Sequence, residues 1–262
     1  MTRKSLPLLA LGLLGLLATA IPTTAQAQPG GRVDLEGTHW RCYIVAQQTP
    51  DVAATVTLED QFNPDTPSTV SVGEPLQFCA PTTKRVLPDG TVSTVEDENA
   101  HLTMYLAPLQ QPNRLVEVTN QFGTFEWAVG SARVLLAPAG KVHGTSTFPL
   151  ADNEQNHFWC YEATGDRANL RVELDDQFNG PDRAKVGKPR YLCNPVEKVH
   201  GGTTFPIEDE DLHLTCYEIT GRQATDPTTV AVETQFEEDM YQITAYELLC
   251  APAEKTFPAP AS

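Results

Sequence analysis

The sequence predicts an all-β protein built from four tandem copies of one disulfide-stapled unit of about 57 residues. Three observations carry this prediction. Short strings of residues recur four times along the chain, apolar and polar side chains alternate within these strings, and the six cysteines fall in three of the four copies. Alternation with a period of two is typical of β-strands, and the chain after residue 27 lacks the apolar spacing of an amphipathic helix.

The first 27 residues are predicted to be a signal peptide. Arg3 and Lys4 precede an apolar run from Leu8 to Ala20, and Ala25-Gln26-Ala27 offers a cleavage site, so we expect cleavage near Ala27. No later stretch approaches the roughly 20 apolar residues of a membrane-spanning helix. We therefore expect a secreted, periplasmic or cell-surface protein without a transmembrane anchor after cleavage.

Three recurring blocks define each copy. The first block begins with a histidine, at His39, His101, His157 and His213. The second contains a glutamine followed by phenylalanine, at Gln61, Gln121, Gln177 and Gln235. The third ends in a lysine, and these lysines, Lys84, Lys141, Lys198 and Lys255, follow one another at intervals of 57 residues. The blocks place copies one to four at residues 36–99, 100–155, 156–211 and 212–258.

The repeat also predicts the disulfide pairing. Copies one, three and four each hold one cysteine in the first block and one in the third, whereas copy two has Met104 and Ala137 instead. Pairing within a copy explains why copy two lacks both cysteines together, since pairing between copies would leave a partner unpaired elsewhere. Exported proteins form such bonds because their compartment is oxidising. The predicted disulfides are Cys42–Cys79, Cys160–Cys193 and Cys216–Cys250.

Each copy is expected to hold three or four strands. In the first block Trp40, Cys42 and Ile44 fall on one face, and His39 and Arg41 fall on the other. A unit of this size has a small core, and the disulfide is the expected compensation. The sequence leaves two arrangements open, in which the copies fold singly or pack in pairs, one with two and three with four, as sandwich-like or barrel-like domains.

The acidic composition excludes one class of partner. The formal net charge is −16, and removal of the leader makes it more negative because Arg3 and Lys4 are lost. A field of this sign repels phosphate backbones, so we expect no nucleic-acid partner. No cysteine belongs to a C-x-x-C pair, and we predict neither a structural zinc site nor a cofactor.

Copy three carries a resemblance to a known family. Its strings are Phe158-Trp159-Cys160-Tyr161, then Asp176-Gln177-Phe178, then Leu192-Cys193-Asn194-Pro195-Val196-Glu197-Lys198. This pattern resembles a family of uncharacterised exported bacterial and archaeal β domains with the order aromatic-x-C-Y, D-Q-F and L-C-x-P-x-x-K. Copy four departs from it with Thr234 in place of the aspartate. The resemblance implies the fold and export and implies no activity.

The repeated polar residues are interpreted as structural. An active site seldom occurs four times in one chain, so each repeated histidine is expected to bond the repeated glutamine or a backbone carbonyl. The repeated lysines are expected in turns or beside surface acids. His143 and His200 lie in a recurring Lys-Val-His-Gly string and are interpreted as solvated turn histidines.

Acidic residues precede copies two, three and four and allow one metal hypothesis. Hard cations bind six to eight oxygen ligands, which clustered carboxylates can supply. A calcium ion at Glu208, Asp209, Glu210 and Asp211 is the specific hypothesis, and a solvated acidic linker is the alternative. The spacing does not follow the EF-hand loop.

The chain contains none of the usual catalytic signatures, such as G-x-S-x-G, H-E-x-x-H or a P-loop. We therefore predict no catalytic residues and a non-catalytic exported protein that acts as a structural or binding module, with an unidentified extracellular or cell-surface partner. The alternative is a secreted hydrolase with a carboxylate site, since such sites leave no linear motif. The nearest candidate for a polar or aromatic feature unique to one copy is Phe125 with Trp127, for which core packing is the better interpretation.

Overall fold

The computed structural model describes residues 37–46, 52–88, 90–111, 113–150, 155–221 and 227–258. The predicted signal peptide lies outside the described residues. The described part of the chain holds sixteen strands and no helix. The predicted all-β class is therefore confirmed.

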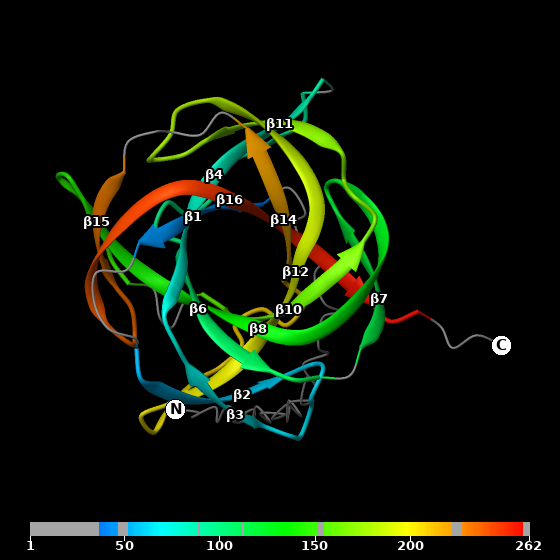
Figure 1. Cartoon of the computed structure of the whole chain (residues 1–262), viewed down its shortest axis with the longest axis vertical. Helices are drawn as coiled ribbons and strands as arrows, with labels where there is room; N and C mark the ends of the chain where they lie inside the picture. Colours follow the sequence, from blue (N-terminus) through cyan, green and yellow to red (C-terminus); the bar gives the residue numbers. More distant parts are fainter. Residues whose placement is uncertain are drawn as a thin grey trace, which may run out of the picture. The chain divides into compact units, whose positions relative to one another are not determined.

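Each of the four copies predicted from the sequence contributes two strands to a closed ring of eight antiparallel strands in the described part of the chain. The ring strands are β1 (His39–Ala46) and β4 (Pro75–Leu87), β6 (His101–Leu109) and β8 (Gly123–His143), β10 (His157–Gly165) and β12 (Asp182–His200), and β14 (His213–Gly221) and β16 (Glu238–Thr256). Each strand pairs with the next, and β16 closes the ring on β1. Figure 1 views this ring end-on. Closure removes the free edges that an isolated strand pair would expose.

Between its two ring strands, each copy forms a hairpin arm outside the ring. The arm strands are β2 (Ala54–Asp60) with β3 (Ser68–Val72), β7 (Arg114–Asn120) with the first part of β8, β11 (Leu170–Asp175) with the first part of β12, and β15 (Thr228–Glu233) with the first part of β16. In Figure 1, β2 and β3, β7, β11 and β15 lie on four sides of the ring. Three short strands, β5 (Val92–Ser93), β9 (Ser146–Phe148) and β13 (Thr203–Phe205), pair with the ends of β4, β8 and β12.

The arms exchange between copies two places apart. β2 of copy one pairs with the end of β12 of copy three, and β11 of copy three pairs with the end of β4 of copy one. Copies two and four exchange β7 and β15 in the same way. The arrangement that pairs one with two and three with four as separate domains is therefore wrong. A copy has too few strands to close a sheet by itself, and only the four together complete the ring.

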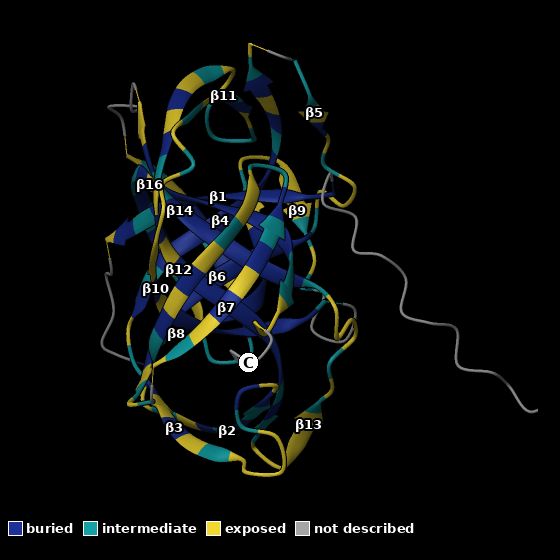
Figure 2. Ribbon diagram, turned by 90° about the vertical axis from the view of Figure 1, so that its right-hand side faces the viewer, coloured by how far each residue is buried: buried dark blue, intermediate teal, exposed yellow. Residues whose placement is uncertain are grey.

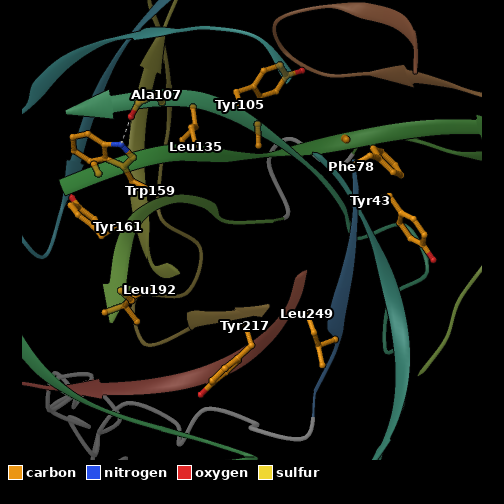
Figure 3. Close-up of a cluster of buried hydrophobic side chains, with 14 of the residues drawn as sticks. Tyr43, Phe78, Tyr105, Ala107, Leu135, Trp159, Tyr161, Leu192, Tyr217 and Leu249 are labelled. Atoms are coloured by element: carbon orange, nitrogen blue, oxygen red, sulfur yellow. Dashed lines mark hydrogen bonds between the residues drawn. The ribbon is translucent and has the colours of Figure 1, made fainter. Parts of the chain in front are cut away.

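Both faces of the ring strands are buried. One cluster includes Tyr43, Tyr161 and Tyr217 on the ring, and Val56 and Val172 on the arms, so this face points outward beneath the arms. Figure 3 shows part of this cluster, with the Trp159 indole donating to the Ala107 carbonyl at 3.2 Å. Figure 2 shows the resulting distribution, with the ring strands mostly buried and exposed residues concentrated on arms and loops.

The opposite face of the ring strands forms a second cluster that includes all six cysteines. Because successive side chains of a strand alternate between faces, these residues point into the ring. The disulfides are Cys42–Cys79, Cys160–Cys193 and Cys216–Cys250, the pairs that the repeat comparison predicted. Each joins residues directly opposite one another on the two ring strands of one copy.

In copy two, the residue that stands in place of the second cysteine is not the one predicted from the sequence. Met104 lies opposite Leu136, and Ala137 lies one residue further on, opposite Thr103. Ala137 corresponds to Ala80, which precedes a proline in the same way. Leu136, and not Ala137, therefore replaces the second cysteine, because only that position faces into the ring.

The exchange of arms predicts that the copies do not fold separately. Removal of residues 212–262 would take away β14 and β16, which are ring partners of β12 and β1, and β15, which pairs with β8. We expect the shortened chain to lose its cooperative thermal transition in far-ultraviolet circular dichroism. A chain ending at Pro258 is the control, and an intact transition in the shortened chain would show that three copies suffice.

Candidate functional site

The repeated histidines are buried at the starts of the ring strands. His213 places Nδ1 2.9 Å from the Asp211 carbonyl oxygen and Nε2 3.1 Å from Gln61 Oε1. His101 has the same arrangement with Asn99 at 3.2 Å and Gln177 at 3.4 Å. Each of these glutamines belongs to the next copy around the ring, so the pair ties neighbouring copies together.

His39 differs in one partner. Its Nδ1 lies 2.8 Å from the Gly37 carbonyl oxygen, and its Nε2 lies 2.8 Å from Lys84 Nζ. In copy one the lysine thus takes the place that the next copy's glutamine has beside His101 and His213, and Gln121 instead donates to Ser93 Oγ at 2.8 Å.

The repeated lysines do not lie in surface turns. Lys84, Lys141 and Lys198 are at most 2% exposed, so the expectation that they lie in turns or beside surface acids is wrong. Each repeated lysine instead places its ammonium over the repeated phenylalanine of the next copy, and these pairs are Lys84–Phe122, Lys141–Phe178, Lys198–Phe236 and Lys255–Phe62, at 4.3–4.8 Å from nitrogen to ring centre. An ammonium over an aromatic ring keeps a favourable electrostatic partner without water, worth about 0.5–2 kcal/mol.

Burial changes the titration of these groups. Burial and the nearby Lys255 lower the pKa of His213 to about 3, and burial with Lys141 lowers the pKa of His101 to about 4. Burial also lowers the pKa of Lys255 to about 7 and that of Lys141 to about 8. In each case the apolar surroundings disfavour the charged form.

The residue before each repeated glutamine connects copies two places apart. Asp60 of copy one accepts hydrogen bonds from the Tyr161 hydroxyl of copy three at 2.9 Å and from the backbone NH of Phe62 at 3.0 Å. Asp176 of copy three accepts reciprocally from the Tyr43 hydroxyl of copy one, at 2.8 Å. Asn120 and Thr234 make the corresponding contacts with Tyr217 and Tyr105 of the opposite copies. The polar residue at this position therefore shapes its own loop and fastens the arm to the ring.

A buried ion pair reinforces the contact between copies one and three. The Arg41 guanidinium donates to Asp176 Oδ2 at 2.6 Å and to Asp182 Oδ1 at 2.8 Å. Copies two, three and four have Thr103, Trp159 and Thr215 at the position of Arg41. This charge is paired inside the protein and belongs to the scaffold.

The recurring Lys-Val-His-Gly strings lie at the ends of β8 and β12. The His143 ring lies 5.5 Å from that of Phe178, and the His200 ring lies 5.1 Å from that of Phe236. Gly144 and Gly201 have positive φ angles, so both strings enter turns. Both histidines therefore line the phenylalanine contacts made by the lysines.

The acidic segment Glu208–Asp211, proposed for calcium, contains hydrogen bonds between its own side chains and the neighbouring backbone. Asp209 Oδ1 accepts from the backbone NH groups of Asp211 and Leu212, at 3.0 and 3.2 Å. Among the described residues, no group of three or more histidine, cysteine, aspartate or glutamate side chains is placed to hold a metal ion. The acidic segment 152–154 lies outside the described residues. The geometry therefore gives the calcium hypothesis at Glu208–Asp211 no ligand set.

Two cavities lie at opposite ends of the ring. The smaller, of about 330 Å³, lies where four ring strands begin and is lined by Trp40, Phe158 and the acidic junctions. The larger, of about 660 Å³, lies where these strands end. Its lining is Ile44, Leu76, Gln77, Met104, Arg190, Tyr191, Glu218, Ile219, Thr220, Tyr246, Glu247 and Leu248. We call the larger space the ring-end cavity.

No polar residue of the ring-end cavity is shared by all four copies. In the third block of each copy one residue faces into the ring, and these residues are Cys79, Leu136, Cys193 and Cys250. The residues three positions before them are Leu76, Arg133, Arg190 and Glu247. The residues two positions before them are Gln77, Val134, Tyr191 and Leu248. The cavity therefore combines an amide, a guanidinium and carboxylates that come from different copies.

Gln77 is the amide of this polar set and contacts one of its carboxylates. Its Nε2 donates to Glu247 Oε2 at 2.9 Å, and the side chain is buried. Its Oε1 is buried and, among the described residues, has no hydrogen-bond partner. A buried acceptor without a donor costs about 1–3 kcal/mol, so a ligand that supplies an NH or OH group would recover this free energy.

This site could not be recognised from the residues that the copies share, because its polar residues differ among the copies. The predicted candidate for a unique feature, Phe125 with Trp127, packs in the core. Trp127 is fully buried, and its ring lies 5.4 Å from that of Tyr217. One sequence feature does point to the site: at the aligned strand positions of Leu76, Arg133, Arg190 and Glu247, the copies carry side chains of different charge.

The fold and the recurring contacts define a class, that of tandem-repeat all-β proteins. The chain belongs to the DUF7450 family, described as a repeat of unknown function, whose model matches residues 99–252. Comparisons with curated proteins and with solved structures found no match. In the described part of the chain, no helix has the length and hydropathy needed to cross a membrane.

Burial of the histidines predicts a loss of stability in weak acid. The unfolded chain binds a proton at each histidine near pH 6.5, whereas folded His213 does so only near 3. The stability contributed by a neutral buried histidine is therefore complete above pH 6.5. It falls by about 1.4 kcal/mol per pH unit and per histidine as the pH decreases towards the folded-state pKa.

The measurement is urea unfolding at pH 7.5 and 5.5 for the natural chain and for His213→Gln. We expect the free energy of unfolding to decrease less in the variant, by about 1.4 kcal/mol over this interval. Equal decreases in the two proteins would mean that His213 titrates alike in the folded and unfolded states.

Proposed function

We propose that the chain is a non-catalytic exported binding module, built from four copies of the family repeat, that acts outside the cell or at its surface. One observation carries this proposal: each repeated lysine contacts the repeated phenylalanine of the next copy, whereas Gln77, Arg190 and Glu247, which stand at positions that differ among the copies, line the ring-end cavity. A scaffold with fourfold internal repetition needs the first group for its own closure. The second group has no such structural requirement.

The ring-end cavity favours a small ligand that is partly apolar. Met104, Leu76 and Leu248 supply an apolar wall. Gln77 and Glu247 supply acceptors for NH or OH groups, and Arg190, which also lines the cavity, supplies donors. A volume of about 660 Å³ lies within the range of small-molecule sites, which combine apolar walls with a few oriented polar groups.

Export is proposed from two independent features. The basic and apolar segments before Ala27 have the order of a signal peptide, and all six cysteines are disulfide-bonded. Disulfides persist in oxidising compartments and are rare in reducing ones. The net charge of −16 argues against nucleic acid as the extracellular partner.

The secreted hydrolase is the second candidate, because Glu218 and Glu247 both line the cavity. Glu218 Oε1 lies 3.1 Å from Lys188 Nζ, and Glu247 accepts from Gln77. Hydrolysis of a glycoside needs one carboxylic acid and one carboxylate directed at the same bond. The pairing of each glutamate with its own neighbour favours binding over hydrolysis.

Export can be tested by expressing the full chain in a bacterial host and fractionating the cells. We expect the mature protein outside the cytoplasm with an N-terminus near Gln28, determined by intact-mass measurement. Protein that stays in the cytoplasm with residues 1–27 attached would contradict export.

The binding site can be tested with a glycan array and a small-metabolite thermal-shift screen. For any ligand found, we expect Arg190→Ala and Glu247→Ala each to weaken binding at least tenfold. Arg133→Ala is the matched control, because Arg133 holds the position of Arg190 in copy two and pairs with Glu162 at 3.3 Å. Unchanged affinity in both cavity variants would place the ligand elsewhere. Turnover of a bound glycan would favour the hydrolase.

A further inference from the structure

The three disulfides form one continuous row of sulfur atoms inside the ring. In ring order the row is Cys79, Cys42, Cys250, Cys216, Cys193 and Cys160. Between the bonded pairs, Cys42 Sγ lies 3.9 Å from Cys250 Sγ, and Cys193 Sγ lies 4.0 Å from Cys216 Sγ. Met104 and Leu136 occupy the two remaining strands at this level, so the row has two ends.

We propose that these six cysteines are a single thiol–disulfide exchange site that takes a dithiol as its co-reactant. A disulfide is exchanged when a thiolate attacks one of its sulfurs and the other sulfur leaves as a thiolate. Each unbonded gap in the row is only slightly longer than the approach distance of reacting atoms. A thiolate formed anywhere in the row therefore has the next disulfide beside it.

One reduction can then travel through the row. A dithiol attacks Cys79, which releases the Cys42 thiolate, and the second thiol of the reagent displaces Cys79 as the cyclic disulfide leaves. The Cys42 thiolate attacks Cys250 and releases Cys216. The Cys216 thiolate attacks Cys193 and releases Cys160. The dithiol loses two electrons and two protons, and the protein ends with thiols at Cys79 and Cys160.

This product differs from the starting state in what its disulfides connect. Cys42–Cys250 joins copy one to copy four, and Cys193–Cys216 joins copy three to copy four. The two thiols lie at the ends of the row, where Met104 and Leu136 separate them. The ring thus keeps covalent links after losing one disulfide, and the links now run between neighbouring copies.

The ring-end cavity lies next to the row of sulfur atoms, and the cysteines themselves are buried. Gln77 and Leu248 line the cavity and lie two residues before Cys79 and Cys250 on the same faces of β4 and β16. Met104, which also lines the cavity, lies opposite Gln77 on the neighbouring strand. Tyr191, two residues before Cys193, lines the cavity as well, so the cavity lies beside the row from Cys79 to Cys193.

The test is partial reduction of the folded protein with dithiothreitol, followed by rapid alkylation with iodoacetamide and peptide mapping without further reduction. In molecules with two alkylated cysteines we expect the cross-links Cys42–Cys250 and Cys193–Cys216, with the label on Cys79 and Cys160. If the label is confined to the native pairs, the proposal is overturned. Cross-links between distant cysteines, such as Cys42–Cys160, in equal yield would overturn it as well, because they indicate scrambling in the unfolded chain.

Two double variants provide matched controls. Cys216→Ala with Cys250→Ala removes the middle of the row, so reduction should stay within the pair that was attacked. Cys160→Ala with Cys193→Ala only shortens the row, so Cys42–Cys250 should still form, with thiols at Cys79 and Cys216. If the first variant fails to fold, the second keeps the test decisive, because absence of Cys42–Cys250 from its products contradicts the proposal.

Discussion

Closure of the eight-stranded ring is the constraint on which the rest of the structure depends. Two antiparallel strands expose an unpaired edge on each side and bury little apolar surface. Four such pairs leave no unpaired edge when each pair bonds to the next and the last strand, β16, pairs with the first, β1. The outward faces of the ring strands then need a cover, and the hairpin arms supply it. Because each arm also pairs with the copy opposite, folding of any copy requires the others.

The buried polar residues follow directly from this closure. A lysine at the end of a ring strand contacts the arm of the next copy. Because burial removes water from the lysine ammonium, the phenylalanine ring of that arm replaces water as its electrostatic partner. An aspartate at the tip of an arm meets a tyrosine of the copy opposite. Such contacts are costly when incomplete, so they favour the one arrangement of copies in which all are made. Copy two shows that the disulfide is the dispensable part of this scheme, since Met104 and Leu136 fill its place with apolar packing.

The sequence predicted the strands, the disulfides and the contacts of His39, His101 and His213, because each of these depends on local alternation or on comparison of aligned residues. It could not predict ring closure, since the partner of a strand edge is not encoded within one copy. The same limit explains the error on the lysines. In sequence, Lys141 is a charged residue near a glycine, and only the arm of copy three, which places Phe178 over it, makes burial tolerable. Gln77 and Arg190 were missed because their proximity arises from strands that are far apart in the chain.

Internal repetition separates structural from functional residues in a protein of this kind. A residue required at every junction of the ring appears in every copy, and its chemistry is used within the fold. A ligand without fourfold symmetry cannot use four equivalent groups at once, so recognition has to come from positions where the copies have diverged. The ring-end cavity meets this condition with Gln77, Arg190 and Glu247, each from a different copy. The row of cysteines also depends on a difference between copies. Because copy two has Met104 and Leu136 in place of cysteines, the row does not run all the way around the ring and ends at Cys79 and Cys160.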